Sequence, residues 1–319
     1  MPQHRETHPW THAMSTTSDA ELVAGLSLRG SAAFEALQVL RARHLPTLLE
    51  YARLCVPEER FAARLCHQTL STAVRVAAAG RVRPRAVRHS LLLLMRRHAA
   101  EWADDDRRQR LEPEFVHWLL EAGDHEIRHE SVPNQLTHAF WRLPQHEQEI
   151  LWYAEIEPGG RELAAICAGV DAAELAYHRD HALTTLLRDY LDTYGTSCDG
   201  PECRGYLRIL DARARSSPPA ALSTEFDAHL AACVRCEHAL TELRTLYTAP
   251  RVALVPALVG YSCLAYAERA TPVPRPAVVR EAAHRHSAPS RPATTLHMAL
   301  AVLFAAVVVG LVLGVRASA

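Results

Sequence analysis

A group of cysteine and histidine residues in the second half of the chain constrains the fold more than any other feature. His229, Cys233 and Cys236 have the spacing His-x3-Cys-x2-Cys, and Cys203 lies upstream. If residues 229–236 form one helix, these three side chains lie within roughly 60° of one another on the same face. Cys203 then completes a Cys3His tetrahedron with no open position, which is typical of a structural zinc site. Such a site stabilises a small domain that buries little apolar surface.

Two thiols compete for the position of the fourth ligand, because Cys198 lies in the turn that precedes Cys203. We favour Cys203, since a helical pattern of apolar residues follows it and would hold it rigidly: Tyr206, Leu207, Ile209 and Leu210. The alternative to a metal site is that these cysteines and the histidine are free or core residues.

This arrangement of ligands resembles the zinc-binding anti-sigma family, whose signature is an upstream Cys or His followed by His-x3-Cys-x2-Cys on a helix. The resemblance covers residues 195–248. It implies a structural zinc domain that packs between the two regions of a sigma factor and hides the surfaces that bind RNA polymerase.

Residues 19–103 resemble region 2 of the extracytoplasmic-function sigma factors, a helical bundle. The matching positions are Asp19, Leu22, Gly30, Ala33, Phe34 and Leu37, followed by Tyr51-Ala52-Arg53. Ser18 to Glu21 has the pattern of a helix-capping box. Residues 85–98 resemble the helix that touches promoter DNA in that family. The segment 61–70 departs from the family, because the acidic residues that dock on polymerase are reduced to Glu58 and Glu59.

Residues 132–194 resemble sigma region 4, since Leu143-Pro144 and Ile150-Leu151 match its opening motif. We predict helices over 161–168 and 172–190, joined by a turn in which Val170 fills the bend and Asp171 caps the second helix. The positions expected to face DNA are Glu174, Tyr177, His178 and Arg179. Acidic residues offset the basic ones on this helix, so we expect DNA binding to be weak.

The segment 295–316 is predicted to be a transmembrane helix, because the twenty residues from Leu296 to Val315 carry no charge. Arginines are more frequent before this run than after it: Arg280, Arg285 and Arg291 precede it and Arg316 follows. The positive-inside rule then places the N-terminal body in the cytoplasm. We therefore expect a single-pass protein of the cell membrane.

The remaining segments connect these parts of an all-α protein. Residues 1–18 are expected to be a flexible tail, 104–131 a linker and 249–294 a linker or tether. Within the last of these, Val252 to Tyr266 is apolar but broken by proline and glycine, and is expected to pack on a partner or on the membrane interface. The net charge of −1 gives no global nucleic-acid footprint, so any DNA contact is local.

The order of these segments predicts a non-enzymatic regulator of transcription initiation, in which a sigma-like body and its zinc-binding inhibitor share one chain. Its expected partners are core RNA polymerase, promoter DNA, the lipid bilayer and the opposite part of the same chain. One alternative is an interaction or scaffold protein whose degenerate sigma regions no longer bind DNA. Another is a zinc metalloprotease, because His125, Glu126 and His129 match the pattern His-Glu-x-x-His.

Overall fold

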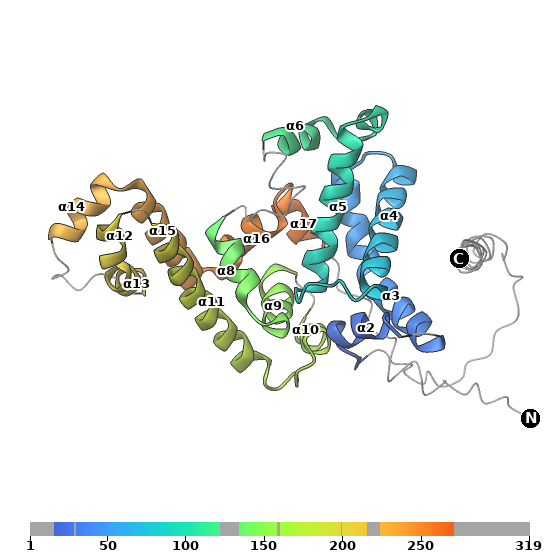
Figure 1. The fold of residues 1–319 in the computed structure, drawn as a ribbon, viewed down its shortest axis with the longest axis horizontal. Helices are drawn as coiled ribbons and strands as arrows, with labels where there is room; N and C mark the ends of the chain where they lie inside the picture. The colour runs from blue at the N-terminus through green and yellow to red at the C-terminus, as the bar shows by residue number, and fades with distance from the viewer. Residues whose placement is uncertain are drawn as a thin grey trace, which may run out of the picture. The chain divides into compact units, whose positions relative to one another are not determined.

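The computed structural model describes residues 16–28, 30–121, 134–157, 160–198, 200–215 and 224–270. These residues form helices joined by short turns, and no strand occurs among them, so the all-α prediction is confirmed for this part of the chain (Figure 1). All of the described helices belong to one compact unit, Met1–Arg275. The predicted transmembrane segment 295–316, the tail up to residue 15 and the segment 271–294 lie outside the described residues.

The first four helices of the described residues pack side by side through one apolar core. They are α2 (Asp19–Gly25), α3 (Ser31–Cys55), α4 (Glu59–Ala78) and α5 (Val87–Ala103). The capping box predicted at Ser18 is present, because Ser18 and Glu21 each accept a hydrogen bond from the backbone of the other. Leu48, Leu65 and Leu92 are fully buried where α3, α4 and α5 meet.

Residues 106–121, which fall in the predicted linker, contain a 3-10 helix η1 (Asp106–Arg110) and the helix α6 (Pro113–Glu121). The linker prediction rested on the charged residues of this segment, but α6 has an apolar face. Phe115 is completely buried and stacks on Trp118, with their ring centroids 5.9 Å apart. Burial of a whole aromatic side chain holds this segment against the rest of the unit.

Residues 135–197 form a second group of helices. It consists of α8 (Gln135–Arg142), α9 (Gln145–Leu151), the π-helix η2 (Trp152–Ile156), α10 (Arg161–Ala168) and α11 (Leu175–Ser197). Helix α10 has the predicted bounds, and Gly169 ends it in a left-handed conformation at φ 72°. Val170 packs against the core at the bend, as predicted.

Helix α11 does not have the predicted bounds. It begins at Leu175, because residues 172–174 form a turn, and it continues to Ser197 because Tyr190 and Tyr194 extend its buried face. The Asp171 carboxylate accepts a hydrogen bond of 2.7 Å from Ala173 N. Asp171 therefore caps this turn rather than the second helix.

Four helices gather near the C-terminal end of α11 (Figure 1): α12 (Pro201–Gly205), α13 (Leu207–Arg215), α14 (Thr224–Ala232) and α15 (Val234–Thr248). Helices α13 and α15 pack on each other and on α11. Leu210 and Leu243 are completely buried between these helices, so this small segment has an apolar core.

The chain then returns to the earlier helices through α16 (Pro250–Val259) and α17 (Cys263–Arg269), which we call the α16–α17 pair. Helix α16 contacts α5, α8 and η2, and α17 contacts α3 (Figure 1). The apolar stretch predicted to meet a partner or a membrane interface thus packs within its own chain, with Leu254 and Leu258 completely buried. Among the described helices, none has by itself the length and apolar character of a membrane span; the two of this pair meet that test only together, across a bend of 109°.

Candidate functional site

The four predicted metal ligands converge in the structure. Cys203 lies on α12, His229 in the last turn of α14 and Cys236 in the first turn of α15. Cys233 lies between the last two helices, in an extended conformation at φ −119° and ψ 95°. The prediction that residues 229–236 form one helix is therefore wrong. The break at Cys233 turns the chain so that its thiol meets the other ligands.

The distances between the ligand atoms suit a tetrahedral metal ion. All four atoms lie within 4.8 Å of one another. Cys203 Sγ is 3.8 Å from Cys233 Sγ and 3.6 Å from His229 Nε2, and His229 Nε2 is 3.2 Å from Cys236 Sγ. Bonds of zinc length would separate two sulfur ligands by about 3.8 Å and a sulfur from a nitrogen by about 3.6 Å. This Cys3His group could hold a metal ion.

Neighbouring side chains orient the ligands. The Tyr194 hydroxyl is 2.9 Å from Cys236 Sγ, and the ring of Tyr206 lies 4.8 Å from that of His229. Burial raises the pKa of Cys236 to about 12. The pKa of Cys233 is lowered instead, chiefly by hydrogen bonding to the backbone N–H of Cys236 at the start of α15. A bound cation favours the thiolate form of both.

Cys198, the competing fourth ligand, is not part of this group. It follows α11 directly and is buried, with 5% of its surface exposed. The ligand group contains Cys203 instead, which the apolar pattern after it had favoured.

The four predicted DNA-facing residues lie at the start of α11. Tyr177 is 72% exposed, and Glu174 is exposed beside His178, with 3.7 Å between the carboxylate and the imidazole. Arg179 binds the carboxylates of Glu155 and Asp180. Its positive charge is thus offset within the chain, and the exposed surface of this turn is mainly tyrosine and carboxylate.

The N-terminal end of α5 contacts the α8–α11 group, which sequence reasoning did not anticipate. The Arg85 guanidinium lies 3.7 Å from the centre of the Trp141 ring. His89 stacks on Trp152, with ring centroids 5.2 Å apart and planes inclined by 19°. Burial, together with the charges of nearby arginines, lowers the pKa of His89 well below its ordinary value, so this ring is neutral. Residues that resembled a DNA-contacting helix are here engaged by aromatic rings.

Helix α9 also caps the first turn of α5. Gln148 Oε1 accepts a hydrogen bond of 3.2 Å from Ala86 N, and Glu149 Oε1 accepts one of 2.7 Å from Val87 N. These bonds satisfy backbone donors that have no partner within the helix. Burial, with the nearby charge of Asp19, raises the pKa of Glu149 well above its usual value. Residues about sixty positions apart therefore share one buried contact.

The α16–α17 pair is hydrogen-bonded to α8 and η2. Arg251 donates hydrogen bonds of 2.9 Å to the carbonyl groups of Glu155 and Ile156. The Thr137 hydroxyl donates to the carbonyl of Ala257 at 2.9 Å. Backbone carbonyls in the pair and in η2 accept these hydrogen bonds, and a backbone acceptor leaves no signal in a local sequence motif.

His125, Glu126 and His129, the residues of the protease alternative, lie outside the described residues. No family model, no curated protein and no solved structure matches the chain.

Proposed function

We propose that this protein is a membrane-anchored regulator of transcription initiation, in which a sigma-like body is held closed by the segment that follows it. The body comprises residues 19–103 and 132–194. The Cys3His group binds structural zinc, because three thiolates and one imidazole suit a closed tetrahedral site for that ion. The segment 295–316 is the anchor.

The observation that carries this proposal is the engaged N-terminal end of α5. In the resemblance this is the helix that touches promoter DNA. Here Arg85 lies on Trp141, His89 stacks on Trp152, and Glu149 caps the first turn. Promoter DNA and these partners would compete for one surface. The described arrangement therefore fits an inhibited state.

The α16–α17 pair is the element that we propose holds the state closed. It contacts both helix groups, and the Tyr266 hydroxyl donates a 2.5 Å hydrogen bond to Glu157, which in turn binds Arg88 of α5. Because the pair is covalently joined to the body, its local concentration is high without a second protein. Opening requires a signal that separates the pair from the body.

The scaffold alternative has an observation in its favour. Arg179, one of the few basic residues on the predicted DNA-facing turn, is bound by Glu155 and Asp180. A helix whose charge is offset in this way has little affinity for phosphates. In that alternative the closed arrangement is permanent, and the exposed surfaces bind another protein.

Retention of core RNA polymerase by the full chain tests the proposal. The double variant Arg251→Ala with Tyr266→Phe removes hydrogen bonds that hold the α16–α17 pair but leaves the Arg88–Glu157 ion pair intact. Arg244→Ala, at an exposed position of α15, is the matched control. Limited proteolysis within residues 249–270 reports whether the pair has been released.

We expect the double variant to be cleaved faster and to retain more polymerase than the wild type or the control. If the pair is released and polymerase is still not retained, the sigma-like function is wrong and the scaffold alternative stands. If the wild type already retains as much polymerase as the variant, the closed state is not inhibitory.

A further inference from the structure

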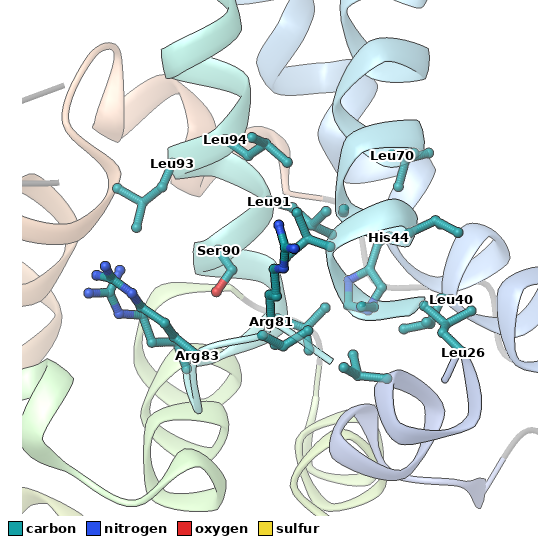
Figure 2. Close-up of a pocket in the computed structure, with 18 of the residues that line it drawn as sticks. Leu26, Leu40, His44, Leu70, Arg81, Arg83, Ser90, Leu91, Leu93 and Leu94 are labelled. Carbon is teal, nitrogen blue, oxygen red and sulfur yellow. The ribbon is translucent and has the colours of Figure 1, made fainter. Parts of the chain in front are cut away.

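A cavity of about 300 Å³ lies among α2, α3, α4, α5 and the loop that joins the last two helices. Its walls are aliphatic, and Leu26, Leu40, Leu70, Leu91 and Leu94 all contribute to them (Figure 2). This volume is at the lower end of the range of small-molecule sites. The cavity is separate from the Cys3His group, but Arg85 and Val87 belong both to its lining and to the contact that the N-terminal end of α5 makes with α8 and α9.

Positive charge accompanies these apolar walls. The lining includes the five arginines Arg41, Arg81, Arg83, Arg85 and Arg97, and no Asp or Glu among its described residues. Figure 2 shows Arg81 extending between Ser90 and His44 toward Leu91, whereas Arg83 points to the other side. Within the described part of the chain, Arg81 and Arg97 form no ion pair.

We propose that this cavity binds an anionic amphiphile, with a single aliphatic chain against the leucines and its head group on Arg81 and Arg97. Guanidinium groups bind carboxylates and phosphates in a bidentate geometry, so either head group satisfies the same chemistry. The aliphatic chain gains from leaving water in proportion to the apolar area that it buries. The aliphatic chain of such a ligand would contact leucines, and its anionic head group would contact guanidinium groups.

A nucleobase is the competing occupant, because the loop of residues 79–86 is basic. Proteins that hold unpaired bases usually stack them on aromatic side chains. The described lining of this cavity contains no Phe, Tyr or Trp. Leucine and valine walls favour an alkyl chain over a polar heterocycle, whose ring nitrogens and carbonyls would face them without hydrogen-bond partners.

Binding to the full chain tests the proposal. The protein is held in digitonin, whose rigid steroid body differs from a single alkyl chain. Dodecanoate, dodecyl phosphate, uncharged dodecanol and a short single-stranded DNA are each titrated by calorimetry. The two anions distinguish a fatty acid from a phosphate-bearing lipid, and dodecanol isolates the contribution of the head-group charge.

We expect at least one of the two anions to bind more tightly than dodecanol. Arg81→Ala and Arg97→Ala should each weaken that binding by about tenfold or more, since a hydrogen bond to a charged group is lost. Arg64→Ala, at an exposed position of α4 outside the cavity, is the control and should bind as the wild type does. Ala73→Trp should block the cavity and abolish binding, and thermal unfolding shows whether this variant is folded.

Three outcomes would overturn the proposal. If dodecanol binds as tightly as both anions, the arginines do not bind a charged head group. Anion binding that is unchanged in both arginine variants places the ligand elsewhere. Binding of the single-stranded DNA alone, with loss in the same two variants, assigns the cavity to nucleic acid.

Discussion

Arg88 and Glu157 form a buried ion pair between α5 and the residue that follows η2, with Nη1 and Oε2 3.1 Å apart. Other groups complete their hydrogen bonding. Arg88 Nε donates to His44 Nδ1 at 3.0 Å, and Glu157 accepts from Trp152 Nε1 at 2.6 Å and from the Tyr266 hydroxyl at 2.5 Å. The Arg88–Glu157 ion pair therefore joins both helix groups to the α16–α17 pair.

The substitution Glu157→Gln should strongly destabilise the protein. It keeps the shape of the side chain but leaves the Arg88 charge buried without a counter-ion, which costs about 3–5 kcal/mol. Urea denaturation followed by circular dichroism measures the change. Glu59→Gln is the control, because Glu59 pairs with Arg53 at the surface and its loss should have little effect. Equal effects of the two substitutions would show that the Arg88–Glu157 pair does not support the fold.

Stability should fall in acid through Asp19. Burial acts to raise the pKa of this carboxyl, but attraction and hydrogen bonds from His44 and Arg43 outweigh it and lower the pKa from 3.8 to about 2. A lowered pKa in the folded state stabilises the protein fully above about pH 4, and this stabilisation is lost as the pH falls toward 2. The shift corresponds to about 2 kcal/mol.

Urea midpoints measured between pH 5 and pH 2 test this dependence. Asp19→Asn should be less stable than the wild type near pH 5, and the difference should shrink as the solution becomes more acidic. Asp192→Asn, at an exposed position of α11, should follow the wild type throughout. A constant difference between Asp19→Asn and the wild type would contradict the assignment.

Gly260→Ala should loosen the α16–α17 pair. Gly260 has φ +71°, and an added Cβ would lie 2.6 Å from Arg96 Nη1 and 3.0 Å from the Trp118 ring. Gly80 is a matched control, because it has φ +64° and nothing within 4 Å of an added Cβ. Gly80→Ala should lower the free energy of unfolding by about 1–2 kcal/mol, because alanine is strained in a left-handed conformation. Gly260→Ala should cost more, and thermal unfolding with limited proteolysis of residues 249–270 measures both effects.

The sequence predicted the features of this protein that depend on near neighbours. These include the all-α class, the capping box at Ser18, the bounds of α10 and the residues of the Cys3His group. It did not predict the ion pair between Arg88 and Glu157, whose partners are 69 positions apart. Nor did it predict the buried helices within 104–121 and 250–269. These helices are short, and what buries their apolar faces is contact with helices distant in the sequence. The local sequence therefore did not distinguish them from linkers.

The break at Cys233 is a different kind of failure. The spacing of His229, Cys233 and Cys236 predicts the same ligands whether residues 229–236 form one helix or two. In one helix, a four-residue step returns to the same face. In two helices, the turn between them can bring the same atoms together. The choice depends on where Cys203 lies, since a metal ion in this group would have to be reached at once from α12, from α14, from Cys233 and from α15.

Metal binding should therefore depend on Cys203 and not on Cys198. Elemental analysis of the purified full chain should find an equivalent of zinc in the wild type and in Cys198→Ser, and much less in Cys203→Ser. Cobalt substitution gives a second reading, because tetrahedral thiolate coordination has a characteristic visible spectrum. A chelator should lower the helicity of the wild type, since closed structural sites contribute directly to folding. Zinc retained by Cys203→Ser but lost from Cys198→Ser would reverse the ligand assignment, and zinc lost from neither would place the ion outside the Cys3His group.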